Sequence, residues 1–225
     1  MRLALNGAAL PFWVIADRQT AGKGRAGRAW ASDAGNLHAS LVMAPNGTVG
    51  RAAELSLVAG VAVIDALKRA APNVQPRLKW PNDILIGDAK MGGILVESTS
   101  TRAGLIAVIG VGLNLASVPQ GLDRLVTSLS AQYPGVQSAP SPLEMLAFLA
   151  EAMHDWQLRW EQGFAPVRAA WLERAGRLGE RLSVNSGAGP VEGEFAGLDD
   201  GGALLLRLAS GETRRFTFGD VSLVP

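Results

Sequence analysis

The sequence contains no cysteine. This absence excludes disulfides, thiol nucleophiles and thiolate metal ligands together, and it is compatible with a reducing compartment. An excess of charge of one sign is also missing, because 21 lysines and arginines stand against 20 aspartates and glutamates, for a formal net charge of +1. A nearly neutral chain has no general attraction for nucleic acid, so any polyanion that it binds must contact a local basic cluster.

Long apolar runs are absent as well. None reaches the roughly 20 residues that a membrane-spanning helix needs, and the apolar stretch at the amino terminus is interrupted by Asn6, Gly7 and Pro11. That stretch lacks the long apolar segment and the cleavage site of a secretory signal. Residues 3–10 are instead typical of the end of a helix at a Gly/Pro turn. We therefore expect a cytoplasmic protein with no membrane role.

The 225 residues suffice for one large domain, or for a medium domain with a small appendage. The first part mixes strands and helices, and from residue 178 onward short strands alternate with glycine-containing turns. This order predicts an α+β fold, with one domain over 1–176 and a small β barrel over 177–225. Strands are expected at 12–16, at 37–43 and over 78–115 with a turn at Gly87-Asp88, and helices at 51–71, from Pro142 after an N-cap at Ser141, and at about 165–175.

The most informative segment is GKGRAGRAW, residues 22–30. Its three glycines let the backbone turn tightly and approach a ligand closely, while Lys23, Arg25 and Arg28 bring cations into a small volume. Arginine forks suit phosphate or carboxylate, and Trp30 offers a flat face for a ring. The segment matches neither a P-loop nor a dinucleotide-binding glycine pattern. An exposed turn with solvated arginines is the alternative.

Polar residues also mark the segment KWPND, 79–83, where a predicted strand begins. Asn82 and Asp83 follow a proline that fixes the backbone, and they provide an amide and a carboxylate. They are either functional groups or part of a turn with a side-chain cap.

Two later strands carry further candidates. KMGGILVE, 90–97, places Lys90 before a glycine pair that would let a substrate lie on bare backbone, although a solvated lysine is the common alternative. GVGLNL, 110–115, carries Asn114 in an apolar strand, where an amide bonded to the backbone is the default interpretation. His38 and His154 have no carboxylate or second histidine near them in the sequence, and we assign them no catalytic role.

In this order and spacing, the segments resemble the biotin protein ligase family, which carries a GxGRxGRxW loop, a KWPND turn, a KxGGILxE strand and a GxGxN strand. FAGLDDGGALLLRL and FGDVSLV are similar to the last strands of that family's SH3-like barrel. The resemblance covers nearly the whole chain. It implies a mixed sheet flanked by helices, as in class II aminoacyl-tRNA synthetases, followed by a small SH3-like β barrel.

The resemblance implies an enzyme of the biotin–acetyl-CoA-carboxylase ligase type. Such a ligase forms biotinyl-5'-AMP from biotin and ATP and then transfers biotin to a lysine of a biotin carboxyl carrier protein. Magnesium is expected to accompany ATP, with no protein ligand assigned to it. The sequence leaves no room for the winged helix that makes some members repressors, so no DNA binding is expected, and a homodimer is one of the states that the resemblance allows.

The resemblance also implies roles by position. Catalysis is assigned to Arg25, Lys90 and Asp83, with Lys90 at the reacting carboxylate and Asp83 aiding the incoming lysine. Biotin contacts are expected from Gln19, Lys23, Gly24, Arg25, Lys90, Gly92 and Gly93. ATP contacts are expected from Lys23, Arg25, Arg28, Trp30, Asn82 and Asn114.

Two departures from the family pattern stand out. Lys23 replaces a common arginine, which keeps the charge but loses the planar fork. The family also has an upstream strand and a Ser-Thr-Asn segment that help hold the ureido ring of biotin, whereas this sequence starts partway into the following helix. The resemblance therefore leaves two expectations: either the start codon is assigned too late, or one wall of the biotin pocket is missing from this polypeptide.

Two alternatives differ in their signatures. A lipoate or octanoate protein ligase shares the catalytic fold but would need another glycine-rich signature with a downstream His-Asp pair, which the sequence lacks. A nucleic-acid-binding module would use the Gly/Arg loop and the terminal barrel, and near-zero net charge disfavours it.

Overall fold

The computed structural model describes residues 1–45, 49–102, 104–119, 121, 124–133, 139–187 and 189–224. Six antiparallel strands form the main sheet, in the order β1-β2-β6-β5-β4-β3. They are β1 (Phe12–Ile15), β2 (Leu37–Met43), β3 (Pro76–Lys79), β4 (Asp83–Ile86), β5 (Ala89–Thr101) and β6 (Gly104–Leu113). The predicted turn at Gly87-Asp88 joins β4 to β5, which confirms the hairpin.

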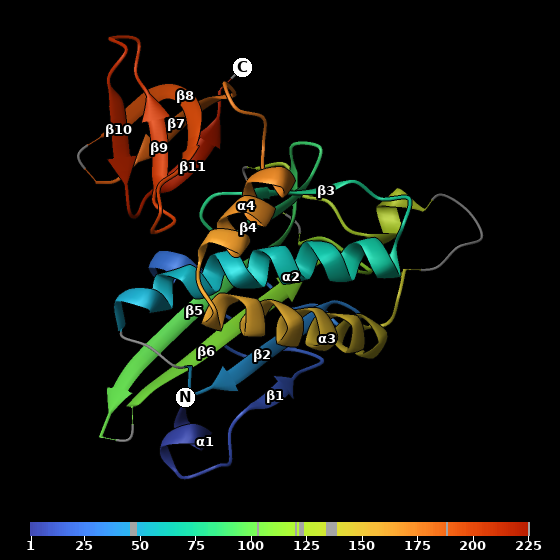
Figure 1. Cartoon of the computed structure of the whole chain (residues 1–225). Helices are drawn as coiled ribbons and strands as arrows, with labels where there is room; N and C mark the ends of the chain where they lie inside the picture. The colour runs from blue at the N-terminus through green and yellow to red at the C-terminus, as the bar shows by residue number, and fades with distance from the viewer. Residues whose placement is uncertain are drawn as a thin grey trace.

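Helices α2 (Glu54–Ala70) and α3 (Pro142–Glu161) lie side by side over one face of this sheet, and α4 (Ala165–Arg174) packs beside α2 (Figure 1). Eleven of the seventeen residues of α2 are buried, because the helix packs against the sheet, α3 and α4. As predicted, α3 begins after Ser141, whose hydroxyl accepts from the backbone of Glu144 while the Glu144 carboxylate accepts from the backbone of Ser141. This capping box fixes the start of the helix.

Side chains alternate between the two faces of the sheet. Leu37, Leu41 and Met43 of β2 join the core under the helices, so His38 and Ser40 point to the opposite face. That opposite face carries the candidate site.

The last five strands form a second antiparallel sheet, in the order β10-β9-β8-β7-β11. They are β7 (Arg181–Asn185), β8 (Pro190–Leu198), β9 (Leu204–Arg207), β10 (Thr213–Phe216) and β11 (Asp220–Leu223). No ladder joins β10 to β11 in the described chain, so the expected barrel is open in its hydrogen bonding. The core side chains of this sheet belong to the same apolar cluster as those of the main sheet, with Trp171 of α4 edge-on to Phe195 of β8 at 6.5 Å between ring centroids.

Two helix boundaries differ from those predicted from the sequence. The amino-terminal helix α1 spans only Arg2–Leu5, because Gly7 adopts a φ of 88° and ends it before residue 10. The helix expected at 51–71 begins as a 3-10 turn over Val49–Ala53. The proposed division between 176 and 177 falls in the connection between α4 and β7 and stays a prediction. No helix in the described ranges is long and apolar enough to cross a membrane.

Candidate active site

A cavity of about 460 Å³ opens on the face of the sheet that α2 and α3 leave uncovered. Its floor is formed by β2, β6 and β5, where Gly110 and Gly112 of β6 lie between Ser40 and His38 of β2 and Leu95 and Gly93 of β5. Three of these six positions are glycines, so no side chain rises from the floor there. The volume is that of a typical small-molecule site.

Trp30 lies directly on this floor. A Cβ atom at Gly112 would be 2.5 Å from Cζ2 of Trp30, and one at Gly93 would be 3.4 Å from its Cζ3. At Gly112, therefore, only glycine lets the indole approach the strand this closely. The Lys90 ammonium group lies 5.8 Å from the indole centroid, within the range of a cation–π contact.

The loop carrying Lys23, Arg25 and Arg28 folds back on itself above the floor. Gly24 N–H donates to the Arg28 carbonyl at 2.7 Å and Trp30 N–H to the Gly22 carbonyl at 2.9 Å. Between these two bonds, the backbone turns at Ala26, which adopts a φ of 53°. Because the loop folds back in this way, its charged side chains line the cavity.

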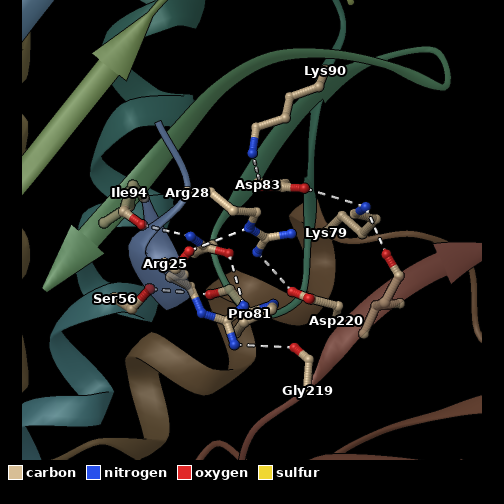
Figure 2. A network of polar contacts seen from close by, with 12 residues as sticks. Arg25, Arg28, Ser56, Lys79, Pro81, Asp83, Lys90, Ile94, Gly219 and Asp220 are labelled. Atoms are coloured by element: carbon tan, nitrogen blue, oxygen red, sulfur yellow. Dashed lines mark hydrogen bonds and ion pairs between the residues drawn. The ribbon is translucent and has the colours of Figure 1, made fainter. Parts of the chain in front are cut away.

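Both arginines of the loop reach the far end of the chain (Figure 2). Arg25 donates to Oδ1 of Asn82 at 3.2 Å and to the carbonyl of Gly219 at 3.0 Å. Arg28 forms an ion pair with Asp220 at 2.8 Å, in which both side chains are about half exposed. Burial lowers the pKa of Arg25, as does neighbouring Arg28, although Asp220 and Asp83 act in the opposite direction. The guanidinium stays charged, because arginine is not deprotonated in proteins.

Asp83 lies between two lysines (Figure 2). It pairs with Lys90 and, at 3.2 Å, with Lys79, and the three side chains are largely buried. Burial alone would raise the pKa of Asp83, but the two ammonium groups outweigh burial and lower it. Burial lowers the pKa of Lys90, and Arg124 and Lys79 add to this while Asp83 opposes it.

The turn that carries these groups is fixed by hydrogen bonds from several elements. The Asn82 amide donates to the Ile94 carbonyl at 2.6 Å, and the Ser56 hydroxyl donates to the Pro81 carbonyl at 3.1 Å. Lys79 also donates to the Val221 carbonyl of β11 at 2.9 Å. The site is therefore braced by the buried helix α2 on one side and by the second sheet on the other.

The structure brings most of the predicted site residues together. The cavity is lined by Gln19, Lys23, Gly24, Arg25, Arg28, Trp30, Asn82, Asp83, Lys90 and Gly93. Gly92 and Asn114, both described, are outside this lining. A Cβ at Gly92 would lie 2.7 Å from the Gly112 carbonyl oxygen, so its glycine serves strand packing. The buried Asn114 amide donates to the Thr127 carbonyl at 3.1 Å, which matches the default interpretation. Their direct ligand contacts stay predictions.

The structure also adds residues that sequence reasoning missed. Lys79 stood inside the KWPND segment and could have been proposed from its charge. His38, Glu97, Arg124 and Asp220 also line the cavity. Glu97 ends the KMGGILVE segment and Asp220 belongs to FGDVSLV, but neither was given a role, and Arg124 lies outside every motif.

The arrangement suits a ligand with an anionic end. Lys90, Arg25 and Arg28 line the same cavity, above a floor of glycine backbone on which the Trp30 ring lies. Such fixed cations can hold two anions against their mutual repulsion. The described residues contain no group of three or more histidines, aspartates or glutamates that could hold a metal ion.

Comparison with known proteins gives two family matches. Residues 3–114 match the biotin/lipoate A/B protein ligase family, and residues 178–224 match the biotin protein ligase C-terminal domain. A biotin–[acetyl-CoA-carboxylase] ligase of Paracoccus denitrificans is 42% identical over 92% of this chain and 87% of its own length.

Solved structures are similar as well. The biotin protein ligase of Aquifex aeolicus in complex with biotin and ATP superposes with a TM-score of 0.82, with 26% identity over 99% of this chain and 93% of that one. The Leishmania major enzyme in complex with biotinyl-5-AMP superposes with a TM-score of 0.65, with 26% identity over 96% and 92% of the two chains.

Proposed function

The chain belongs to the biotin/lipoate A/B protein ligase family, and from this premise we propose that it is an ATP-dependent biotin protein ligase. In the first step, the carboxylate of biotin attacks the α-phosphate of ATP, forming biotinyl-5'-AMP and releasing pyrophosphate. In the second, a lysine amine of a biotin carboxyl carrier protein attacks the acyl carbon and releases AMP.

One observation carries this proposal. The GKGRAGRAW loop, the KWPND turn and the KMGG strand, which are far apart in the sequence, line a single cavity that combines several cations with a glycine floor. A carboxylic acid with a neutral ring system and a nucleoside triphosphate are the ligands that such a cavity fits. Relatives of this chain are biotin ligases, and similar structures hold biotin with ATP or biotinyl-5-AMP.

Lys90 and the two arginines have the central electrostatic role in this proposal. Lys90 lies beside the floor, where it can contact both the reacting carboxylate and the α-phosphate. Arg25 and Arg28 line the same cavity and face the remaining phosphate oxygens. Because their partners Asn82, Gly219 and Asp220 hold them in place, little reorganisation is needed when charge develops in the transition state.

Asp83 acts mainly on Lys90. A carboxylate whose pKa is lowered by two ammonium groups is a weak base, which disfavours proton removal from the incoming lysine as its main role. Its ion pair with Lys90 instead fixes the position of the ammonium group.

The finer assignments rest on the family alone. We infer a carrier of the acetyl-CoA-carboxylase type, because the Paracoccus relative bears that name. Magnesium would enter with ATP, and since magnesium in such sites is held largely by substrate phosphates and water, no cluster of protein ligands is required. A homodimer and a cytoplasmic location stay predictions.

Pyrophosphate exchange into ATP tests the function. We expect exchange with biotin and none with lipoate or without an acid, followed by transfer of labelled biotin to an apo carrier protein. Exchange with lipoate alone would identify a lipoate ligase, whereas no exchange together with nucleic-acid binding that weakens steeply with salt would identify the binding module.

A further inference from the structure

One carboxylate and two ammonium groups form a compact triad that lines the cavity. The Lys90 ammonium group donates to Oδ1 of Asp83, and the Lys79 ammonium group lies 3.2 Å from Oδ2, so each lysine holds a different oxygen of the carboxylate (Figure 2). All three side chains are at most 20% exposed. With one negative and two positive charges, the triad has an excess of one positive charge.

Lys79 is held beside Asp83 by two separate elements. It is the last residue of β3, and the strand register sets it opposite Asp83, the first residue of β4. Its ammonium group also donates to the Val221 carbonyl of β11 at 2.9 Å. An ammonium group has three donors, so two of those of Lys79 are bound to protein oxygens. These two contacts keep Lys79 at the carboxylate when a ligand enters the cavity.

Lys90 has more freedom. Within the described residues its ammonium group donates to Asp83 alone, which leaves two donors for ligand oxygens. In the proposed reaction these oxygens belong to the biotin carboxylate and the α-phosphate, so Asp83 and the substrates compete for one ammonium group. If Lys90 were the sole partner of Asp83, its departure would leave a buried carboxylate unpaired, which is strongly unfavourable.

We propose that Lys79 is a positioning residue, which keeps Asp83 paired while Lys90 engages the substrates. Because Lys79 holds Oδ2, Lys90 can shift from Oδ1 toward the substrate anions without leaving the carboxylate alone. The excess positive charge of the triad then acts on the charge that develops in the transition state. The inference rests on the proposed function, and it gives a role to a lysine that the resemblance to the family left without one.

The charges around the triad support this division of roles. Burial lowers the pKa of Lys90, Asp83 opposes the shift, and Arg124 and Lys79 lower the pKa further. Burial would raise the pKa of Asp83, but Lys90 and Lys79 outweigh it, so the carboxylate is charged at neutral pH. Removal of Lys79 would take away both a like charge near Lys90 and a competitor for Asp83. Both losses would raise the pKa of Lys90 and tighten its ion pair with Asp83.

The test combines two substitutions in one cycle. Lys79→Met removes the charge and keeps the apolar stem, whereas Lys79→Arg keeps the charge. Asp83→Asn and the double variant Lys79→Met/Asp83→Asn complete the cycle, and Lys68→Met, at an exposed position of α2, is the matched control. The kcat and the KM values for biotin and ATP are measured by pyrophosphate exchange across pH, and folding is measured by thermal denaturation.

A second readout is independent of activity. The chain has four lysines, at positions 23, 68, 79 and 90, so their ammonium groups can be titrated one by one. With lysine labelled with carbon-13 at Cε, the signal that is lost in Lys90→Met identifies Lys90, and its chemical shift against pH gives the pKa. We expect this pKa to rise in Lys79→Met and to return toward the wild-type value in Lys79→Arg.

We expect Lys79→Met to lower kcat about 10–100-fold, the usual effect of losing one hydrogen bond between charged groups, with both KM values within about threefold of wild type. The alkaline decline of adenylation should move to higher pH, because the pKa of Lys90 rises. Lys79→Arg should recover most of the rate. In the Asp83→Asn background, Lys79→Met should change kcat much less, because no carboxylate then competes for Lys90.

Three results would overturn the proposal. One is an equal loss of kcat from Lys79→Met in both backgrounds, and another is an unchanged pKa of Lys90 in Lys79→Met. The third is a raised KM for ATP with kcat retained, which would identify a direct contact between Lys79 and phosphate. If Lys79→Met does not fold, Lys79→Gln, which keeps a donor for the Val221 carbonyl, takes its place. A wild-type protein without biotin-dependent exchange refutes the proposed function, while the titration still decides whether Lys79 controls Lys90.

Discussion

Replacing Lys90 tests the electrostatic account of the site most directly. Its side chain is 13% exposed and pairs with Asp83, which also keeps Lys79 at 3.2 Å. Lys90→Met retains the apolar stem and removes the charge, and Asp83 is not left unpaired. We therefore expect a folded variant whose adenylation rate falls about 10²–10³-fold, the effect of losing one preorganised donor in a transition state, or roughly 3–4 kcal/mol.

The pH dependence gives a second, sharper readout. Burial lowers the pKa of Lys90, with Arg124 and Lys79 adding to the shift and Asp83 opposing it. The protonated ammonium is the active form, so adenylation should decline as pH rises through this lowered pKa, before an ordinary lysine would titrate. Lys90→Arg stays charged throughout, because arginine titrates above about pH 12. The arginine variant should therefore lose this alkaline decline, whatever its absolute rate.

The assay is biotin-dependent pyrophosphate exchange across neutral and alkaline pH. Lys68→Met, which removes an exposed lysine of α2, is the control for a general loss of positive charge. The reasoning is refuted if folded Lys90→Met keeps more than about a tenth of the wild-type rate, since one preorganised donor is worth more than that. It is equally refuted if Lys90→Arg retains the alkaline decline.

Three further predictions follow from the same geometry. Arg25→Ala should no longer retain biotinyl-5'-AMP through gel filtration, as detected by mass spectrometry. The reason is that the residue that joins Asn82 to Gly219 beside the adenylate is lost. Retention equal to wild type would contradict this role of Arg25. Gly112→Ala should lower the free energy of unfolding by about 1–3 kcal/mol in denaturant titrations, because its Cβ would be 2.5 Å from the Trp30 ring. Gly110→Ala, whose Cβ meets nothing closer than 3.5 Å, should cost clearly less. Asp83→Asn should lower the free energy of unfolding at neutral pH, and the difference from wild type should close below about pH 4. A carboxylate with a lowered pKa stabilises the fold above its usual pKa and loses this effect as pH falls through the pKa of the folded state. A difference in unfolding free energy that is independent of pH would rule out the ion-pair explanation.

Local sequence signals were sufficient for most of the elements. Strand β2 was predicted with its observed ends, and the start of α3 followed from Ser141 and Pro142, because both depend on neighbouring residues. The amino-terminal helix was predicted too long, since Gly7 breaks it through a positive φ that apolar patterning does not reveal. The open pairing of the second sheet depends on contacts between strands, which short apolar runs do not specify.

In the candidate site too, residues in local sequence motifs were predicted, and residues brought in by contacts between strands were not. Residues within recognisable segments, such as Arg25 and Lys90, were predicted and lie in the cavity. His38 was assigned no role because nothing near it in the sequence suggests one. It lines the cavity because the register sets it opposite Gly112, which is a property of the fold.

The contribution of the second sheet was hidden for a different reason. Arg25 and Lys79 donate to the carbonyls of Gly219 and Val221, and a backbone carbonyl is present whatever the residue type. Asp220, paired with Arg28, contributes a side chain to this contact. Strand β11 therefore completes the wall that positions the cations largely through its backbone. Because both donors would lose a part-buried acceptor without β11 and the glycine before it, the second sheet is part of the candidate active site and more than an appendage to it.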